Sequence, residues 1–382
     1  MLLNGNRYAV CATKNPTNKM NNNWTYKKLG ELVSIHTGKL DANAANENGK
    51  YPFFTCAITP LRINSYSYDC ECVLIAGNGD LNVKYYNGKF DAYQRTYIIE
   101  KKPDVENVLI YYIYYFFQTY IEELRYRSIG GIIKYIKLGD LTNAIIPIPP
   151  LSEQEVIVRE LDLIHSIIDK KNEQLRELDK LAQSVFYTMF GDPIINDKNW
   201  EVKKLGEIAP CIKFSEDIYS KEGKYWLLNL DMVESNTGNI IDYLWVEKDE
   251  IGNSTTTFNE KYVLYSKLRP YLNKVVLPIH SGYCTTELLP LLPDKSLHRI
   301  YLAHLLRSDS FVKHISLKVA GAKMPRVTMD DFRGFLCPLP PLSLQQEFAK
   351  KVEAIEVQKE LIRKSIAEVE TLLASRMQHY FG

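Results

Sequence analysis

Two short segments in the second half of the chain combine basic, amide and aromatic residues in the way that nucleic-acid contacts do. The first, SKLRPYLNK, supplies Lys267, Arg269, Asn273 and Lys274. The second, GAKMPR, supplies Lys323 and Arg326. Lys and Arg bind phosphate oxygens, and Arg can also donate two hydrogen bonds to the edge of a guanine. Both segments are therefore candidate DNA contacts, although a solvated basic surface or an intramolecular ion pair would use the same residue types.

The first half of the chain contains a comparable set of candidates. They are Tyr93, Gln94, Arg95, Arg125, Arg127 and Lys134. Gln is suited to adenine and Arg to guanine, because each side chain can form two hydrogen bonds with that base. The same two alternatives, a solvated surface and internal ion pairs, apply here.

The chain contains no recognisable catalytic motif. It lacks GxxxxGK[ST], an N/D-P-P-Y/F methyltransferase motif, HExxH and a nuclease-type PD…ExK cluster. Its seven histidines are dispersed, and its closest cysteines, Cys70 and Cys72, have C-x-C rather than C-x-x-C spacing. We therefore predict no catalytic residue, no metal site and no cofactor. Unclustered cysteines are typical of reduced thiols, which predicts a cytoplasmic location.

Composition excludes several classes of protein. Of 382 residues, 46% are hydrophobic, and 47 basic residues balance 46 acidic ones. A disordered chain would be less apolar and more charged, and a uniformly basic nucleic-acid coat would not be balanced. No apolar run reaches the ~18 residues of a membrane span, so we expect no membrane contact. Residues 1–23 resemble an unstructured tail, in which Met20 is a possible true start.

The sequence repeats itself once. KKLGE follows Trp24 and recurs, as KKLGE, after Trp200, at an offset of 176 residues. IPIPPLSEQE at Ile146 matches CPLPPLSLQQ at Cys337, at an offset of 191 that holds to the final Phe-Gly of each copy. The chain is therefore two copies of one unit, with 15 more residues inside the second copy.

Each copy divides into a body and a long helix. We expect bodies at 24–150 and 192–341, with helices at 151–191 and 342–382. Strand-like runs, separated by Gly/Asn turns such as GNGD and YNGKF, precede Tyr-rich helical stretches, which predicts an α+β body whose tyrosines mainly pack. Pro-rich PIPP and PLPP segments should end the bodies. Ser152 with Glu155, and Ser343 with Gln346, fit capping boxes at the helix starts.

The helices show heptad repeats. The predicted seam residues of the first are Leu161, Ile164, Ile168, Leu175 and Leu178. Those of the second are Val352, Ile355, Ile362, Ile366 and Val369. Because the second helix follows body two, at the end of the first helix, the pair should run antiparallel, with a pseudo-two-fold axis and the bodies at opposite ends. Lys171 and Lys359 interrupt the seam, either as register or partner features or as side chains that reach solvent.

These motifs, repeated over residues 24 to 382, resemble the specificity (S) subunit of type I restriction-modification systems. IAGNGD…YYNGKFDAYQRTYII resembles one type of target recognition domain, YSKLRPYLNKV another, and GAKMPRVTMDDF a segment that recurs before the Pro-rich end. In the first copy that segment is GGIIKYIKLGDL, with Lys134 in place of Pro325.

The resemblance implies a non-catalytic DNA-recognition subunit. Each body would be a target recognition domain that reads one half of a bipartite double-stranded DNA target. The helices would dock two modification (methyltransferase) subunits, and restriction (translocase and nuclease) subunits would join the assembly. The alternatives are a coiled-coil scaffold with two protein-binding heads and a single-chain restriction-methylation enzyme. Body one sums to +1 and body two to zero, so DNA affinity would come from local patches and partner subunits.

Overall fold

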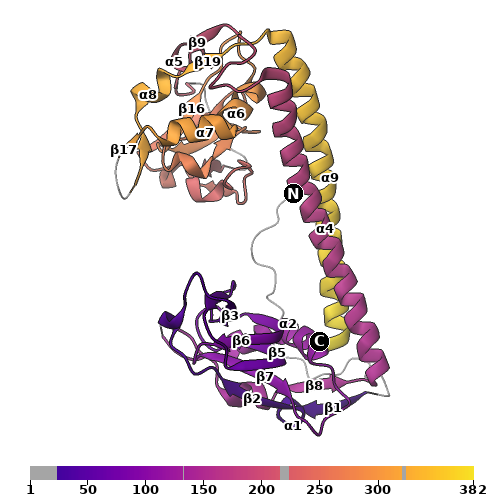
Figure 1. The fold of residues 1–382 in the computed structure, drawn as a ribbon. Helices are drawn as coiled ribbons and strands as arrows, with labels where there is room; N and C mark the ends of the chain where they lie inside the picture. The colour runs from indigo at the N-terminus through magenta and orange to yellow at the C-terminus, as the bar shows by residue number, and fades with distance from the viewer. Residues whose placement is uncertain (1–23, 132, 216–222, 321–323) are drawn as a thin grey trace. The chain divides into compact units, whose positions relative to one another are not determined.

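The chain forms two compact units, which are described separately. The structure, a computed structural model, describes residues 24–131, 133–215, 223–320 and 324–382. Unit 1 is Met1–Lys170 with Ile366–Gly382, and unit 2 is Lys171–Ser365. Two 40-residue helices, α4 (Leu151–Phe190) and α9 (Leu342–Phe381), each contribute one part to each unit (Figure 1). The predicted tail, 1–23, lies outside the described residues.

Body 1 is built on a six-stranded sheet. The strand order is β2-β7-β5-β6-β3-β4, and the pairs are antiparallel except β3 with β6. The strands are β2 (Val33–Thr37), β3 (Tyr51–Phe54), β4 (Leu61–Ile63), β5 (Tyr68–Ala76), β6 (Val83–Ala92) and β7 (Thr96–Lys101). Helix α2 (Ile110–Arg127) packs against β5 and β6, and its Tyr112 and Tyr115 are buried in the main core, as the Tyr-rich pattern predicted.

One predicted turn of body 1 is wrong. The Asn-Gly of YNGKF lies inside strand β6, where Asn87 and Gly88 face Glu71 and Cys70 of β5. Gly88 adopts a φ of 133°, which only glycine tolerates easily, so the strand passes through without turning. The GNGD segment at Gly77 is the actual turn between β5 and β6.

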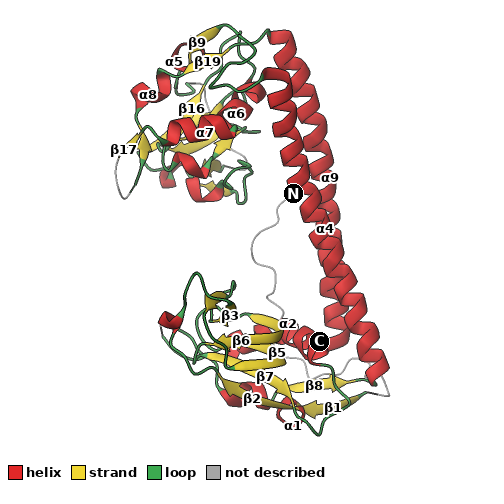
Figure 2. Ribbon diagram, viewed as in Figure 1, coloured by secondary structure: helices red, strands yellow, loops and turns green. Residues whose placement is uncertain are grey.

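Body 2 has smaller sheets in an α+β arrangement (Figure 2). A four-stranded sheet has the order β11-β10-β15-β12, and a three-stranded sheet the order β14-β13-β16. The strands are β10 (Tyr225–Leu228), β11 (Leu244–Val246), β12 (Thr255–Phe258), β13 (Val263–Ser266), β14 (Val275–Val276), β15 (Gly282–Thr285) and β16 (Leu288–Leu291). β17 (Val319–Ala320) pairs with β18 (Arg326–Val327). The helical stretch of body 2 forms two helices, because Ser308 ends α6 (Arg299–Arg307) and caps α7 (Asp309–Ser316).

A two-stranded ribbon, formed by the repeated motifs, closes each body. In body 1, β1 (Thr25–Lys28) pairs with β8 (Ile145–Ile148); in body 2, β9 (Val202–Lys204) pairs with β19 (Leu336–Pro338). The LGE residues form α1 (Leu29–Leu32) and α5 (Leu205–Ile208), and α3 (Leu138–Thr142) and α8 (Met329–Arg333) precede the second strands. The first proline of each Pro-rich segment therefore lies inside a strand, not after it, because a two-stranded ribbon has free edges that need no N–H donor.

The long helices start differently from the predicted capping boxes. They begin at Leu151 and Leu342, so Ser152 and Ser343 are exposed residues inside the first turn. The anchoring residue is instead the fully buried Gln154 and its repeat equivalent, Gln345. The Gln154 amide donates to the carbonyls of Pro149 and Asn107, both at 2.9 Å, and its oxygen accepts from the Leu109 N–H at 3.0 Å.

Gln345 repeats this arrangement in body 2. Its amide donates to the carbonyls of Pro340 and Ser296 at 2.7 and 3.0 Å, and its oxygen accepts from the His298 N–H at 2.8 Å. In each body the glutamine side chain thus ties the start of the long helix to the Pro-rich segment before it and to the loop before α2 or α6. This explains the Gln of the repeated PPLSxQ motif.

The two helices run antiparallel within each unit. In unit 1, Glu160 of α4 meets Arg376 of α9; in unit 2, Asp179 meets Lys359. As the α4 residue number rises, that of its α9 partner falls, as antiparallel pairing requires. The predicted seam residues Leu161, Ile164, Val352 and Ile355 are buried, and the other six are half-buried. The antiparallel coiled coil and α+β fold class are therefore confirmed.

An ion pair joins the helices in unit 1. The Arg376 guanidinium donates to both Glu160 oxygens, at 2.5 and 2.9 Å, and the Tyr380 hydroxyl donates to Glu160 at 2.5 Å. The hydrogen bond from Arg376 lowers the pKa of Glu160. This bidentate contact fixes which turn of α9 lies beside Glu160.

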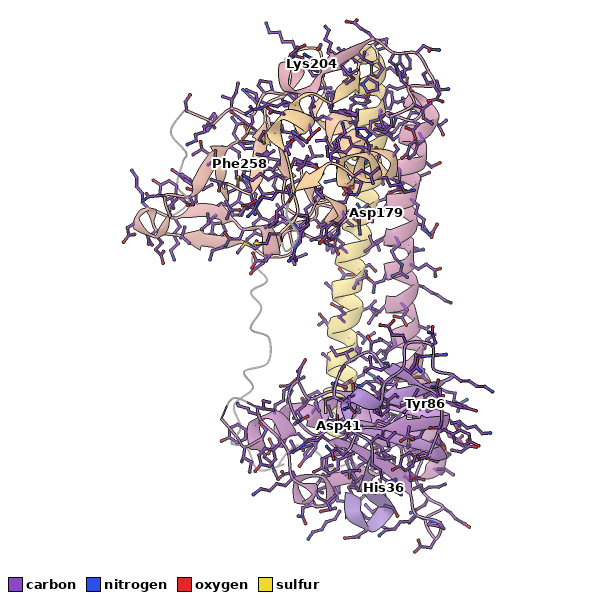
Figure 3. All side chains as sticks on the ribbon, turned by 60° about the vertical axis from the view of Figure 1, so that its left-hand side comes forward. His36, Asp41, Tyr86, Asp179, Lys204 and Phe258 are labelled. Atoms are coloured by element: carbon purple, nitrogen blue, oxygen red, sulfur yellow. The ribbon has the colours of Figure 1, made fainter. Side chains whose placement is uncertain are left out.

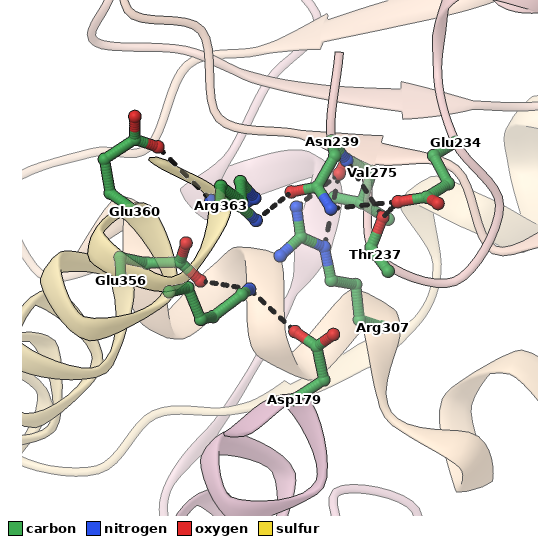
Figure 4. A network of polar contacts seen from close by, with 10 residues as sticks. Asp179, Glu234, Thr237, Asn239, Val275, Arg307, Glu356, Glu360 and Arg363 are labelled. Atoms are coloured by element: carbon green, nitrogen blue, oxygen red, sulfur yellow. Dashed lines mark hydrogen bonds and ion pairs between the residues drawn. The ribbon is translucent and has the colours of Figure 1, made fainter. Parts of the chain in front are cut away.

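Unit 2 uses a buried lysine for the same purpose. Lys359 is 3% exposed and donates to Asp179 and Glu356, both at 2.7 Å. Four residues further along α9, Arg363 reaches Asn239 of body 2 at 3.4 Å (Figure 4). In this structure the side chain of Lys359 ends at the helix seam and does not reach solvent, which supports the register alternative for that residue.

We predict that Gln154→Ala destabilises unit 1. The substitution leaves the Leu109 N–H and two carbonyls without their partner, at a cost of about 2–4 kcal/mol. Denaturant unfolding of the full chain measures the loss. Gln174→Ala, at an exposed position of the same helix, is the matched control and should change stability by no more than about 0.5 kcal/mol. Equal effects of both variants would contradict the anchoring role.

We also predict that reversing one charge of the helix ion pair is harmful and that reversing both is not. Arg376→Glu places two carboxylates together and should cost about 1–2 kcal/mol, whereas the double variant with Glu160→Arg should recover most of it. The pKa of Glu160 in the folded protein is lowered from 4.5. The ion pair of the wild-type protein therefore stabilises the fold above pH 4.5, and this stabilisation is lost as the pH falls below that value. Thermal unfolding at pH 7 and pH 3 tests both statements.

Candidate nucleic-acid interface

Loops at one end of the body 1 sheet bring several predicted contact residues together. The turn from Gly77 to Asn82 joins β5 to β6, and the turn Tyr93–Arg95 joins β6 to β7. The Gly77 N–H donates to the Arg95 carbonyl at 2.8 Å, and the Gly79 N–H donates to the Lys134 carbonyl at 3.0 Å. The side chains of Gln94, Arg95 and Lys134 are exposed there, and Tyr93 is half-buried.

Arg125 and Arg127, at the end of α2, form internal contacts. Arg125 donates to the Leu81 carbonyl at 2.8 Å, contacts Asp80 at 3.5 Å and pairs with Glu122. Arg127 donates to Glu123 at 2.6 Å, and this hydrogen bond raises the pKa of Arg127. Both therefore match the ion-pair alternative, and Arg125 also holds the turn that follows β5.

A hollow of about 460 Å³ opens in body 1. Its lining includes Phe54, Ile58, Arg62, Lys84 and Tyr86, the last of which is labelled in Figure 3. Burial lowers the pKa of Lys84. Lys84 contacts Asn82, and Asn82 in turn donates to the Cys56 carbonyl at 2.8 Å, so the hollow shares its rim with the turn after β5.

Body 2 presents its candidates on a similar turn, Lys267–Pro270, which follows β13. The Lys267 N–H donates to the Glu287 carbonyl at 3.1 Å, and the Arg269 N–H donates to the Pro325 carbonyl at 2.8 Å. Arg269 is exposed and has a φ of 50°, in the left-handed region that non-glycine residues rarely adopt. The Lys267 side chain is half-buried beside Arg269 on the same turn.

Arg326 faces this turn and is held by a carboxylate. Its Nε and Nη2 atoms donate to Glu287 at distances from 2.9 to 3.3 Å. The pair remains accessible, with side chains 42% and 26% exposed. Hydrogen bonding raises the pKa of Arg326 and lowers that of Glu287, so both stay charged. The sequence did not indicate this pairing, because Glu287 lies 39 residues before Arg326.

Two predicted contacts point into body 2 instead of toward the surface. Asn273 is 7% exposed, and its amide donates to the Arg307 carbonyl at 3.0 Å. Lys274 donates to the Leu230 carbonyl at 2.8 Å, and desolvation lowers its pKa. These side chains tie the loop before β14 to the last residue of α6 and to Leu230. Lys323 lies outside the described residues.

Among the described residues, no group of three or more His, Cys, Asp and Glu side chains could hold a metal ion. Burial raises the pKa of the thiols of Cys70 and Cys337 to about 12 in each case, so neither is an activated nucleophile. The part of the chain that the structure describes contains no helix long and apolar enough to cross a membrane.

Two curated relatives resemble the chain along most of its length. It is 29% identical to the EcoDI type I restriction enzyme specificity subunit of Escherichia coli over 378 residues, 90% of this chain and 83% of that protein. It is 22% identical to the MjaVIII specificity subunit of Methanocaldococcus jannaschii over 390 residues, 91% of this chain and 89% of that one.

Solved structures show the same fold. The S subunit of the type I restriction-modification system from M. genitalium superimposes with a TM-score of 0.58 at 15% sequence identity, over 97% of this chain and 99% of that one. A chain from a structure of type I R-M system assembly and conformational transition gives a TM-score of 0.53 at 16% identity, over 95% and 99%.

Comparison with a family model agrees with the resemblance that the sequence motifs suggested. The family described as the type I restriction modification DNA specificity domain matches the chain twice, at residues 21–180 and 197–371. Those two matches fall on the two copies of the repeat, and the prediction of a non-catalytic DNA-specificity subunit is confirmed at this level. The chain belongs to the type I restriction-modification DNA specificity family and contains two copies of its domain.

Proposed function

We propose that each body reads one half of a bipartite double-stranded DNA target, and that the paired helices dock two modification subunits to which restriction subunits are added. The observation that carries this proposal is that the same ribbon and helix anchor occur in both bodies, whose sheets and exposed side chains differ. The ribbon and the Gln anchor are nearly identical in the two bodies, whereas their surface turns carry different residues. Two such readers in one chain suit a target with two unlike halves.

The exposed cations that support this proposal are few. Arg95 and Lys134 in body 1 and Arg269 in body 2 are exposed, and the half-buried Lys267 and Arg326 of body 2 add to them. A small number of phosphate contacts gives weak and salt-dependent affinity. We therefore expect the partner subunits to supply much of the binding energy, while this chain selects the sequence.

The strained backbone at Arg269 also supports a role for its side chain. A left-handed conformation costs a non-glycine residue about 1 kcal/mol, and glycine avoids that cost. Residues held in such conformations cluster at functional sites. Because Arg269 is exposed and occupies this conformation, its guanidinium is a candidate phosphate contact.

Methylation mapping tests the proposed function directly. The full chain is co-expressed with its modification subunit in a host that lacks other adenine methylation, and the methylated positions are sequenced. The expected result is one motif with two defined halves and an undefined spacer of fixed length. Absence of any motif, with the complex assembled, would favour the scaffold with two protein-binding heads.

Arg269→Gly separates DNA contact from stability. The substitution relieves the left-handed backbone, so the melting temperature of the complex should stay the same or rise. Loss of one phosphate contact should weaken binding to every DNA sequence and reduce the slope of log K against log salt by about 1. Lys261→Ala, at an exposed position before β13, is the control. Unchanged binding by the glycine variant would exclude the contact.

A further inference from the structure

The surface turns of the two bodies share a backbone arrangement that the sequence repeat does not reveal. We call it the corner: in body 1 it comprises Gly77–Asp80, Arg95 and 134–136, and in body 2 Lys267–Pro270, Glu287 and 325–327. The repeat aligns 134–136 with 325–327, with Lys134 in place of Pro325, but the two sets of residues have no obvious sequence similarity. Their backbone hydrogen bonds nevertheless correspond one to one.

Three hydrogen bonds define the correspondence. Gly77 N–H to Arg95 carbonyl, at 2.8 Å, matches Lys267 N–H to Glu287 carbonyl, at 3.1 Å. Gly79 to Lys134, at 3.0 Å, matches Arg269 to Pro325, at 2.8 Å. Ile136 to Gly77, at 3.1 Å, matches Val327 to Lys267, at 3.0 Å. The bridges Asn78–Tyr135 and Leu268–Arg326 also coincide.

The left-handed residue is part of the same correspondence. Gly79 has a φ of 70° and Arg269 a φ of 50°, so the turn has the same shape in both bodies. In body 1 this left-handed position is occupied by Gly79, which adopts such a φ without strain, and in body 2 by the exposed Arg269. The corner is therefore a constant frame on which side chains vary.

The arginine of the corner occupies a different position in each body. The position of Arg95 in body 1 is that of Glu287 in body 2, and the position of Tyr135 is that of Arg326. Each body thus places an arginine on the frame, but on opposite sides of the turn. A cation that only neutralised a fixed structural carboxylate would not change sides in this way.

In body 2 the carboxylate also orients the arginine. Glu287 occupies the Nε and Nη2 edge of the Arg326 guanidinium, at 2.9 to 3.3 Å. A guanidinium has five N–H donors, so its Nη1 and Nη2 edge keeps two of them. Two parallel donors on a fixed plane match the O6 and N7 acceptors of guanine.

We propose that the corner is the base-reading element of each body, with Arg326 the specificity-determining residue in body 2, Glu287 its positioning residue, and Arg95 the counterpart in body 1. The inference rests on the proposed function and adds to it the residues that choose the bases. It predicts that changes in one corner alter one half of the DNA motif and leave the other half intact.

The test is methylation mapping of the full complex with corner variants. Arg326→Ala and Glu287→Gln should each lower methylation of the wild-type motif by about 10-fold or more and relax the base preference at a position in one half. Arg95→Ala should relax the other half only. Lys261→Ala in body 2 and Lys101→Ala in body 1 are exposed controls that should leave the motif unchanged.

An exchange variant separates reading from structural support. Glu287→Arg combined with Arg326→Glu keeps the ion pair but moves the arginine to the side used in body 1. A purely structural pair would leave the motif and its methylation level unchanged, and that result, in a complex with wild-type melting temperature, overturns the proposal. A changed base in one half supports it. If the wild-type complex gives no bipartite motif, the proposed function fails and this inference fails with it.

Discussion

Neither body completes its core without both long helices. Ile157, Val158 and Leu161 of α4 are buried in the main core of body 1, and Leu373, Met377 and Phe381 of α9 pack against it. In body 2 the buried set includes Phe186 and Phe190 from the end of α4 and Phe348 and Val352 from the start of α9. Because burying a large apolar side chain contributes about 1.5–3 kcal/mol, these residues make helix pairing and body folding one process. Each unit consequently contains residues from distant parts of the chain.

Polar contacts between α4 and α9 fix the register in which the two helices pair. Apolar seams tolerate slippage, whereas a buried charge requires its partner at one position. Glu160 with Arg376 serves unit 1, and Lys359 with Asp179 and Glu356 serves unit 2. The buried amides of Gln154 and Gln345 then fix the start of each helix to the body that precedes it.

On this frame the exposed turns are free to differ. The hydrogen bonds that shape each corner join main-chain atoms, so the side chains can change with little effect on the fold. Arg95, Arg269 and Arg326 can therefore occupy different sites in the two bodies while the backbone hydrogen bonds of the corner correspond. A net charge of +1 is compatible with DNA reading, because base selection depends on a few placed donors and the bulk of electrostatic affinity can come from other subunits.

The sequence alone determined the duplication, the two α+β bodies and the antiparallel helices, because motif order and heptad spacing are local or repeat-level signals. It also placed Arg95, Lys134, Arg269 and Arg326 among the contact candidates, since residue type suggests chemistry. Only the tertiary structure decided which candidates are exposed. Asn273 and Lys274 turn inward because main-chain carbonyls from other segments meet them, and Arg125 holds a turn far away in the sequence.

The strand that carries YNGKF, the helix starts at Leu151 and Leu342, and the two corners were likewise decided by tertiary contacts. In each case the local signal was weaker than pairing with a distant segment. Pairing with β5 keeps β6 extended through Gly88. Gln154 donates hydrogen bonds to the carbonyls of Asn107 and Pro149, which precede the helix. The pair of Glu287 and Arg326 joins residues 39 positions apart whose proximity depends on strand pairing in body 2. Long-range pairing of this kind has no signature in residue type or spacing, which is why only the folded chain shows it.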